Sequence, residues 1–244
     1  MKKAVLYITM IFSIQSFCQN NGSITYHGAM DLKKVSESYN SGKYDTLPSK
    51  RKDIIKKILE SNHIVEFTLD FKDNKSKFKQ VKKLKEDDGN LNLASIIGGK
   101  GIIYTDLSQN IILDQKEAFG ELFLVESKID SIKWKLTKET KTINDFVCYK
   151  ATTVKKIKNS SGVHEKEVIA WYTPSISANF GPAGYCNLPG LILELKVGKF
   201  IYQTKKINLK IINIKITKPT KGEKVSIEEF DDIGLEMSER LIKN

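Results

Sequence analysis

The amino-acid sequence predicts a mainly β protein, with a single curved antiparallel sheet or partly open barrel of about ten strands. Three observations predict this class. Apolar and polar residues alternate over many short segments, as in residues 63–71, where Val65, Phe67 and Leu69 share one face. Turn sequences rich in Asp, Asn and Gly separate these segments. The intervals between most segments are too short for crossover helices, so we expect an antiparallel meander and not βαβ units.

The alternating segments give the expected strands in chain order. They are 22–28, 63–71, 77–84, 101–106, 110–114, 119–126, 132–138, 145–157, 163–173, 190–197, 199–205 and 207–217. The close succession of the later segments favours hairpins between sequence neighbours.

Two stretches have helical periodicity. In residues 49–61, an apolar stripe that includes Ile54 and Ile58 follows a candidate cap at Ser49. In residues 226–243, Ser226 precedes two glutamates, and apolar residues recur at helical spacing. We therefore expect one or two amphipathic helices, over 49–61 and 226–243.

The N-terminal segment is typical of a signal peptide. It has a basic start, mostly apolar residues over 4–14, and small residues at Ser16 and Cys18 that suit a cleavage site. Its apolar run is too short to cross a bilayer. A lipoprotein signal, in which Cys18 is acylated and kept, is the alternative, but Phe17 does not fit that processing. We expect residues 1–18 to be removed and the protein to be exported, to the periplasm or the outer membrane.

The remainder, residues 19–244, is expected to form one domain. It contains no internal repeat and no long linker, and no later run is apolar enough for a transmembrane span. The formal net charge of +11 comes from lysines spread over nearly every segment. Dispersed lysines are typical of the solvated faces of strands, so we expect no nucleic-acid partner.

No catalytic or metal-binding pattern is found. The histidines His27, His63 and His164 are not at ligand spacing, and none of the common nucleophile, zinc or calcium motifs is present. Residues 98–101 (GGKG) are similar to a phosphate-binding loop, but no Ser or Thr follows the lysine. We expect no enzyme activity, no catalytic residue, no metal and no cofactor.

Two cysteines, Cys148 and Cys186, remain after the expected processing. An even number of cysteines in an oxidising compartment favours a disulfide. We therefore predict a Cys148–Cys186 bond.

The stretch NLPGLI raises the question of why a Pro-Gly pair precedes so apolar a run. Proline presets the backbone for a β-turn and glycine tolerates the positive φ that such a turn requires. We interpret Pro189-Gly190 as a turn that enters a buried strand. The motif consists of Asn187, Leu188, Pro189, Gly190, Leu191 and Ile192; beyond it we expect Leu191, Leu193 and Leu195 to be buried and Glu194 and Lys196 to be exposed.

The alternative is a recognition loop. In that case Leu188 and Pro189 would lie exposed beside Trp171 or Tyr185, and these four residues are the binding candidates that the sequence offers. Aromatic residues beside an exposed apolar loop are common at binding surfaces.

Four motifs together resemble one family. The peptides DFVCYKATT (145–153), IAWYTPSI (169–176), FGP (180–182) and NLPGLILEL (187–195) resemble the GLPGLI family of exported bacterial proteins. The chain departs from the family pattern at Asn187, where the family has glycine. The resemblance implies a GLPGLI-type β domain over 19–244 with a role in the cell envelope, because many members are encoded near genes of outer-membrane receptors.

Two functional hypotheses follow from the predicted compartment and fold. The first is a non-catalytic binding or carrier module that holds an apolar or lipidated ligand, such as a lipid, inside a curved sheet. The second is a structural accessory that docks on an outer-membrane receptor or assembly. The sequence leaves the ligand, the partner and the oligomeric state open.

Overall fold

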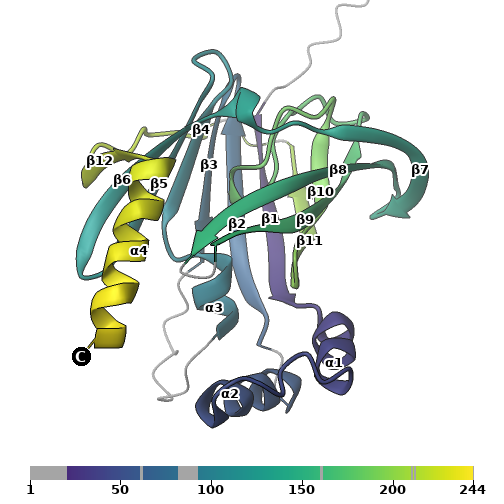
Figure 1. Ribbon diagram of the computed structural model, residues 1–244. Coiled ribbons are helices and arrows are strands. Elements are labelled where there is room, and N and C mark those ends of the chain that lie inside the picture. Colours follow the sequence, from purple (N-terminus) through teal and green to yellow (C-terminus); the bar gives the residue numbers. More distant parts are fainter. Residues whose placement is uncertain are drawn as a thin grey trace, which may run out of the picture.

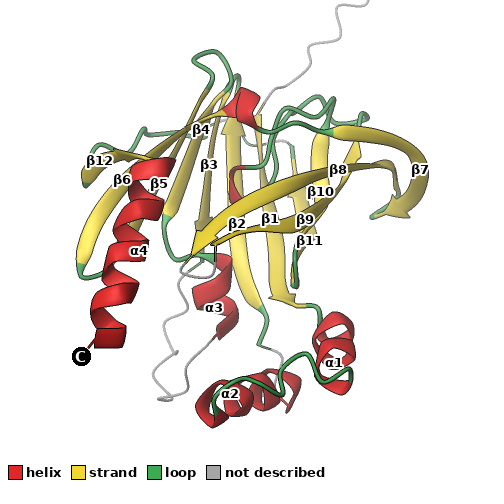
Figure 2. Cartoon of the chain, in the orientation of Figure 1, coloured by secondary structure: helices red, strands yellow, loops and turns green. Residues whose placement is uncertain are grey.

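The computed structural model describes residues 21–60, 63–81, 93–159, 162–209, 211 and 213–243 (Figure 1). The predicted signal peptide and part of the predicted strand 77–84 lie outside these ranges. The described chain forms one large open sheet with helices at its periphery (Figure 2). The prediction of a mainly β protein built on a curved antiparallel sheet is therefore confirmed.

The sheet contains 12 strands. They are β1 (Asn21–Met30), β2 (Val65–Lys72), β3 (Lys75–Gln80), β4 (Ile102–Asp106), β5 (Ile111–Ala118), β6 (Glu121–Lys128), β7 (Lys135–Ile143), β8 (Phe146–Asn159), β9 (Gly162–Thr173), β10 (Leu191–Val197), β11 (Phe200–Asn208) and β12 (Glu223–Ser226).

The helices are fewer and mostly short. They are α1 (Leu32–Asn40), α2 (Ser49–Glu60), α3 (Leu93–Gly98) and α4 (Ile227–Lys243), with 3-10 turns η1 (Ile129–Ser131) and η2 (Pro182–Gly184). The two predicted helices correspond to α2 and α4. Helices α1 and α3 were not predicted, because nine and six residues are too few for the periodicity to be distinguished from that of loops.

The order of strands explains how one sheet accommodates the whole chain. The order is β12-β6-β5-β4-β3-β2-β1-β11-β10-β9-β8-β7, so strands β1 to β6 run outward from the centre and β7 to β11 return to it. The two meanders join where β1 pairs with β11, and neighbours are antiparallel except β12 with β6. Among the described residues of the segment 207–217, the predicted strand is not found: β11 ends at Asn208. Residues 213–222 cross the outer face, where Ile216 packs on Tyr104, Leu113 and Leu124.

The core lies on the inner face of the sheet, and a long loop fills much of it. Residues 174–190 connect β9 to β10, yet their η2 turn contacts β3 and β4 in the other half of the sheet. Phe180, Cys186 and Leu188 of this loop are each at most 1% exposed and belong to the main core cluster. The loop therefore stabilises the sheet by covering its apolar inner face.

The sheet is strongly bent. The long β8–β9 hairpin passes in front of the opposite half of the sheet, and β8 contacts α4, which packs on β6 and β12 (Figure 1). The Lys158 amine lies 2.6 Å from the Asp232 carboxylate and links the hairpin to α4. Elements from near both edges of the open sheet thus meet, and the hairpin forms one wall of the pocket described next.

Candidate functional site

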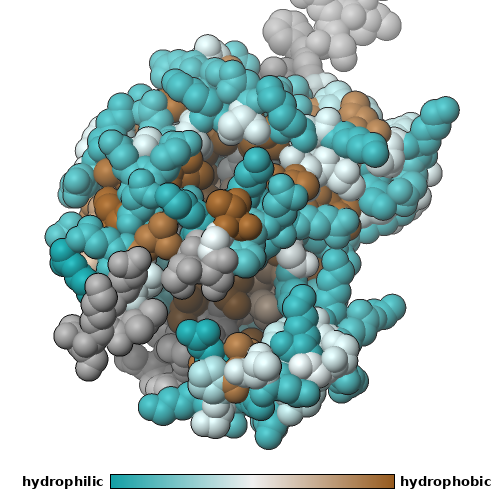
Figure 3. All heavy atoms as spheres, in the orientation of Figure 1, coloured by the Kyte–Doolittle hydropathy of each residue, from teal (hydrophilic) through white to brown (hydrophobic). Residues whose placement is uncertain are grey.

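A pocket of about 470 Å³ opens on the inner face of the sheet. Its walls come from β3, β4 and β5, from α3, from the β8–β9 hairpin and from the loop that follows β9. This volume lies within the range of roughly 300–1,000 Å³ that is usual for small-ligand sites. The space-filling view shows hydrophobic side chains gathered in a hollow above α1 and α2 (Figure 3).

Apolar and polar groups both contribute substantially to the lining of this inner pocket. Its apolar residues are Phe78, Ile96, Ile97, Ile103, Ile157, Ala183, Tyr185, Val197, Phe200 and Tyr202. Ile96 and Ile97 of α3 are each 49% exposed, an unusual exposure for two consecutive large aliphatic side chains. A ligand in the pocket would remove this surface from water.

Helix α3 is held in place by close packing at its end. A Cβ on Gly98 would approach the Phe67 ring to 2.5 Å, so only glycine allows this contact. The Tyr202 hydroxyl donates a hydrogen bond of 2.9 Å to the Gly98 carbonyl, and burial raises the pKa of this tyrosine. The GGKG sequence therefore ends a helix that forms one wall of the pocket.

Charged residues line the pocket beside this apolar surface. Lys100, Lys116, Lys155 and Lys166 supply positive charge, and Asp114 and Glu117 supply negative charge. The Lys116 amine forms an ion pair of 2.9 Å with Asp114 and lies 4.1 Å from the centre of the Phe230 ring. The pocket thus combines apolar walls with an excess of positive charge.

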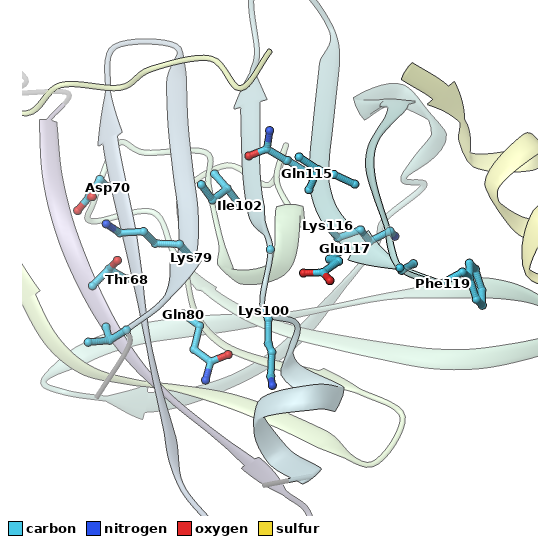
Figure 4. Close-up of a pocket in the computed structure, with 15 residues that line it drawn as sticks. Thr68, Asp70, Lys79, Gln80, Lys100, Ile102, Gln115, Lys116, Glu117 and Phe119 are labelled. Atoms are coloured by element: carbon cyan, nitrogen blue, oxygen red, sulfur yellow. The ribbon is translucent and has the colours of Figure 1, made fainter. Parts of the chain in front are cut away.

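A second, wider hollow of about 1090 Å³ adjoins the first, and the two share Lys100, Gly101, Lys116 and Glu117. Its lining is also mixed, and polar side chains of β2 and β3 line one part of it (Figure 4). Lys79 lies beside Thr68, its cross-strand partner on β2. We take the inner pocket as the candidate site because it is the more enclosed of the two and is lined by core residues such as Phe78, Phe200 and Tyr202.

The structure separates the four binding candidates of the sequence. Tyr185 lines the inner pocket and packs beside Trp134, with ring centres 6.0 Å apart. Trp171 lies on β9 under the Lys141 amine, 4.5 Å from its ring centre. Leu188 is buried in the core and Pro189 is exposed, so the four do not form one surface.

The apolar residues that follow the Pro-Gly pair are placed as predicted. Leu191, Leu193 and Leu195 are fully buried. Glu194, expected to be exposed, is only 6% exposed, and Lys196 is half-buried. The reason is that the Glu194 carboxylate pairs with the Lys141 amine at 2.9 Å and accepts a hydrogen bond from Gln203 at 3.3 Å, so neighbouring strands cover it.

The turn differs in detail from the one predicted. The Gly190 amide donates to the Leu188 carbonyl at 2.7 Å, which closes a three-residue turn in place of a four-residue β-turn. Gly190 has the predicted positive φ, at 144°, and Asn187 is left-handed at 66°. Asparagine accepts this conformation better than most residues, so its presence in place of the family glycine is compatible with the turn.

The predicted Cys148–Cys186 disulfide is not present: both cysteines are free and buried. Each packs as a small hydrophobic residue in the main core cluster. Burial raises the pKa of the Cys148 thiol to about 11 and that of Cys186 to about 12. Thiols in this state react slowly, because the thiolate is the nucleophile in disulfide formation.

The parts of the chain that the structure describes hold no group of three or more His, Cys, Asp or Glu side chains arranged to bind a metal. Among the same residues, no helix is long and apolar enough to cross a membrane. What the geometry offers is a pocket for binding, with tyrosines and lysines at its wall.

Fold and site together define a class: an open-sheet, mainly β protein with an apolar pocket on its inner face. A family model described as "Protein of unknown function (Porph_ging)" matches residues 155–194. This segment contains five of the residues that line the pocket: Lys155, Ile157, Lys166, Ala183 and Tyr185. The match does not confirm the GLPGLI name that the motifs suggested. No curated protein is similar enough to the chain to give a match.

Two solved structures are similar in fold, and both are of PNGF-II. The structure in the C2 space group has a TM-score of 0.52 and 13% identity, and the match covers 88% of this chain and 32% of that chain. The structure in the P21 space group has a TM-score of 0.49 and 14% identity, with 88% and 33% covered. The chain thus spans about a third of the length of these proteins, and at this identity the first likeness concerns the fold alone.

Proposed function

We propose that the protein is an exported, non-catalytic binding module of the cell envelope that holds an apolar or lipidated ligand in its inner pocket. The observation that carries the proposal is the pocket of about 470 Å³, whose lining includes ten apolar residues, two of them half-exposed isoleucines on α3. Burying such a surface against an acyl chain contributes about 25 cal/mol per Å² of apolar area. The basic, apolar N-terminal segment supports export.

The proposal is tested by ligand binding. Native mass spectrometry of protein purified from the envelope should show a copurified lipid, and a neutral apolar dye should gain fluorescence when it binds the lipid-free protein. Ile97→Glu should weaken dye binding at least about fivefold, because it places a charge on the apolar wall. Leu136→Glu changes an equally exposed aliphatic residue on β7, away from the pocket, and should leave dye binding unchanged.

Two results would count against this function. One is the absence of both copurified lipid and dye binding. The other is an equal loss of dye affinity in Ile97→Glu and Leu136→Glu, which would show that binding is not localised to the pocket. The intact mass of the envelope protein also tests the expected processing, since a retained and acylated Cys18 adds the mass of its lipid.

A second candidate, a structural accessory that docks on an outer-membrane receptor, is favoured by the sheet edge. Strand β7 is the last strand on its side, and Leu136, Val147 and Tyr149 near it are 54%, 53% and 37% exposed. An exposed edge with apolar side chains can accept a partner strand. Under this candidate, Leu136→Glu should reduce pull-down of envelope partners while Ile97→Glu should not.

A further inference from the structure

The inner pocket has more positive charge than its own residues neutralise. Of its four lysines, only Lys116 forms an ion pair with a described residue, at 2.9 Å from Asp114. Lys100, Lys155 and Lys166 have no carboxylate within 4.0 Å among the residues that the structure describes.

Two of these lysines are forced together by the hairpin. Lys155 on β8 and Lys166 on β9 are directly paired across the antiparallel ladder. Like charges at such positions destabilise a hairpin, because their Cβ atoms are only about 5 Å apart. Both side chains line the pocket, at the wall opposite the isoleucines of α3.

The surroundings of Lys155 increase this repulsion between like charges. Desolvation of its amine lowers the pKa of Lys155 although the residue as a whole is exposed, and the charges of Lys116 and Lys166 lower this pKa further. Asp114 and Asp231 act in the opposite direction without forming an ion pair with it. A negatively charged group in the pocket would relieve the repulsion between the lysines.

We propose that the inner pocket is specific for ligands in which an acyl chain ends in an anionic group, and that Lys155 and Lys166 hold that group. The inference rests on the proposed function, since it assumes that an apolar chain occupies the pocket. The chain lies against Phe78, Phe200 and the isoleucines of α3, and the anion lies at the hairpin. Carboxylate and phosphate share the chemistry that two ammonium groups recognise.

The experiment compares three ligands with the same twelve-carbon chain: dodecanoate, dodecyl phosphate and dodecanol. Each displaces the neutral apolar dye from the purified protein at low ionic strength. At least one anion should bind about tenfold more tightly than dodecanol, as expected for two charge contacts. The advantage should shrink in 0.5 M sodium chloride, because salt screens the lysines. The difference in affinity between dodecanoate and dodecyl phosphate shows whether the pocket prefers a carboxylate or a phosphate headgroup.

The double variant Lys155→Gln/Lys166→Gln should remove most of this advantage, because it weakens binding of the anions much more than binding of dodecanol. The control is Lys133→Gln/Lys135→Gln, which lowers the net charge equally at exposed positions outside the pocket. Melting curves of both variants establish that they fold.

The outcomes separate the two proposals. If dodecanol binds as tightly as both anions, or if the two double variants lose the same affinity, the specificity inference is overturned and the apolar site stands. If none of the three ligands nor the dye binds, the proposed function itself fails.

Discussion

At the scale of single residues, the loop over 174–190 depends on glycines that other parts of the chain approach closely. A Cβ on Gly181 would lie 2.6 Å from the Ile192 side chain. A Cβ on Gly190 would lie 2.1 Å from the Thr173 carbonyl oxygen, a backbone atom that cannot move aside. The FGP and NLPG peptides thus act as scaffold, since they let the loop lie flat against the sheet.

Gly190→Ala tests this role. It should lower the free energy of unfolding by more than about 3 kcal/mol, from the cost of a strained φ of 144° together with the clash. Gly162→Ala is the matched control: its φ is also positive, at 107°, but a Cβ there meets nothing within 4 Å, so about 1 kcal/mol is expected. Urea denaturation measures both, and equal losses would contradict the steric argument.

The two buried thiols give a second prediction at this scale. In a chain that starts after Cys18, native protein at pH 7 should take up no iodoacetamide on Cys148 or Cys186 over an hour, because burial raises both pKa values to about 11 and 12. After unfolding in guanidinium without reductant, both should be alkylated. Mass spectrometry measures the labelling. An unlabelled chain whose mass is 2 Da below that of the dithiol form would show that the disulfide is present after all.

At the scale of elements, the C-terminal helix α4 begins with a capping box. The Glu229 amide donates to the Ser226 hydroxyl at 3.1 Å, and the Ser226 amide donates to the Glu229 carboxylate at 2.7 Å. The helix then packs Phe230 on Phe123, with ring centres 5.3 Å apart. The cap fixes where α4 begins, directly after the short strand β12, and so directs its apolar side onto β6.

Ser226→Ala should therefore destabilise α4 by about 1 kcal/mol, because the Glu229 amide loses the hydroxyl that accepts its hydrogen bond. Ser238→Ala removes the same atom within the helix, where the hydroxyl only bonds to the Leu235 carbonyl three residues back, and should be neutral or slightly stabilising. Hydrogen exchange of the first turn of α4 is the measurement. Equal protection in the two variants would show that the cap is not the controlling interaction.

Strand β10 illustrates a different effect at this scale. Its sequence alternates, which predicts one exposed face, but Ile192 and Glu194 are as buried as the leucines. The register shift between Ile192 and Glu194 and the cover given by Lys141 and Gln203 account for this. The inner face of β10 packs in the core, and side chains of β7 and β11 cover Glu194 on the other face.

At the scale of the whole molecule, β1 joins the two meanders into one sheet, and polar side chains on its outer face strengthen the junction. The Glu66 carboxylate on β2 accepts a hydrogen bond from the Lys205 amine on β11 and lies 3.3 Å from His27 Nε2 on β1. Lys205, and to a smaller degree His27, lower the pKa of Glu66 below its usual 4.5.

This lowered pKa predicts a pH dependence. A carboxylate whose pKa is lower in the folded state stabilises it above the unfolded pKa, and the contribution disappears as the pH falls through the folded value. Glu66→Gln should therefore be clearly less stable than the parent at pH 7, and the difference should shrink at pH 3. Glu165→Gln, at an exposed carboxylate of the hairpin, should show little difference at either pH. A pH-independent effect of Glu66→Gln, measured by urea denaturation, would refute the assignment.

What the sequence alone determined is the local structure. Period-two alternation over 63–71 and 163–173 predicted β2 and β9, and the apolar stripe behind Ser49 predicted α2, because these patterns depend only on neighbours along the chain.

Tertiary structure decided what depends on distant partners. Lys141 covers Glu194 from another strand, η2 crosses to β3 and β4, and the bend of the sheet brings Lys155 and Ile157 of the hairpin opposite Phe78 and Ile96. The pocket residues are up to 124 positions apart in sequence, from Phe78 to Tyr202, so no local pattern could reveal them. Only the curvature of one sheet, closed on its inner side by the hairpin and α3, makes them neighbours.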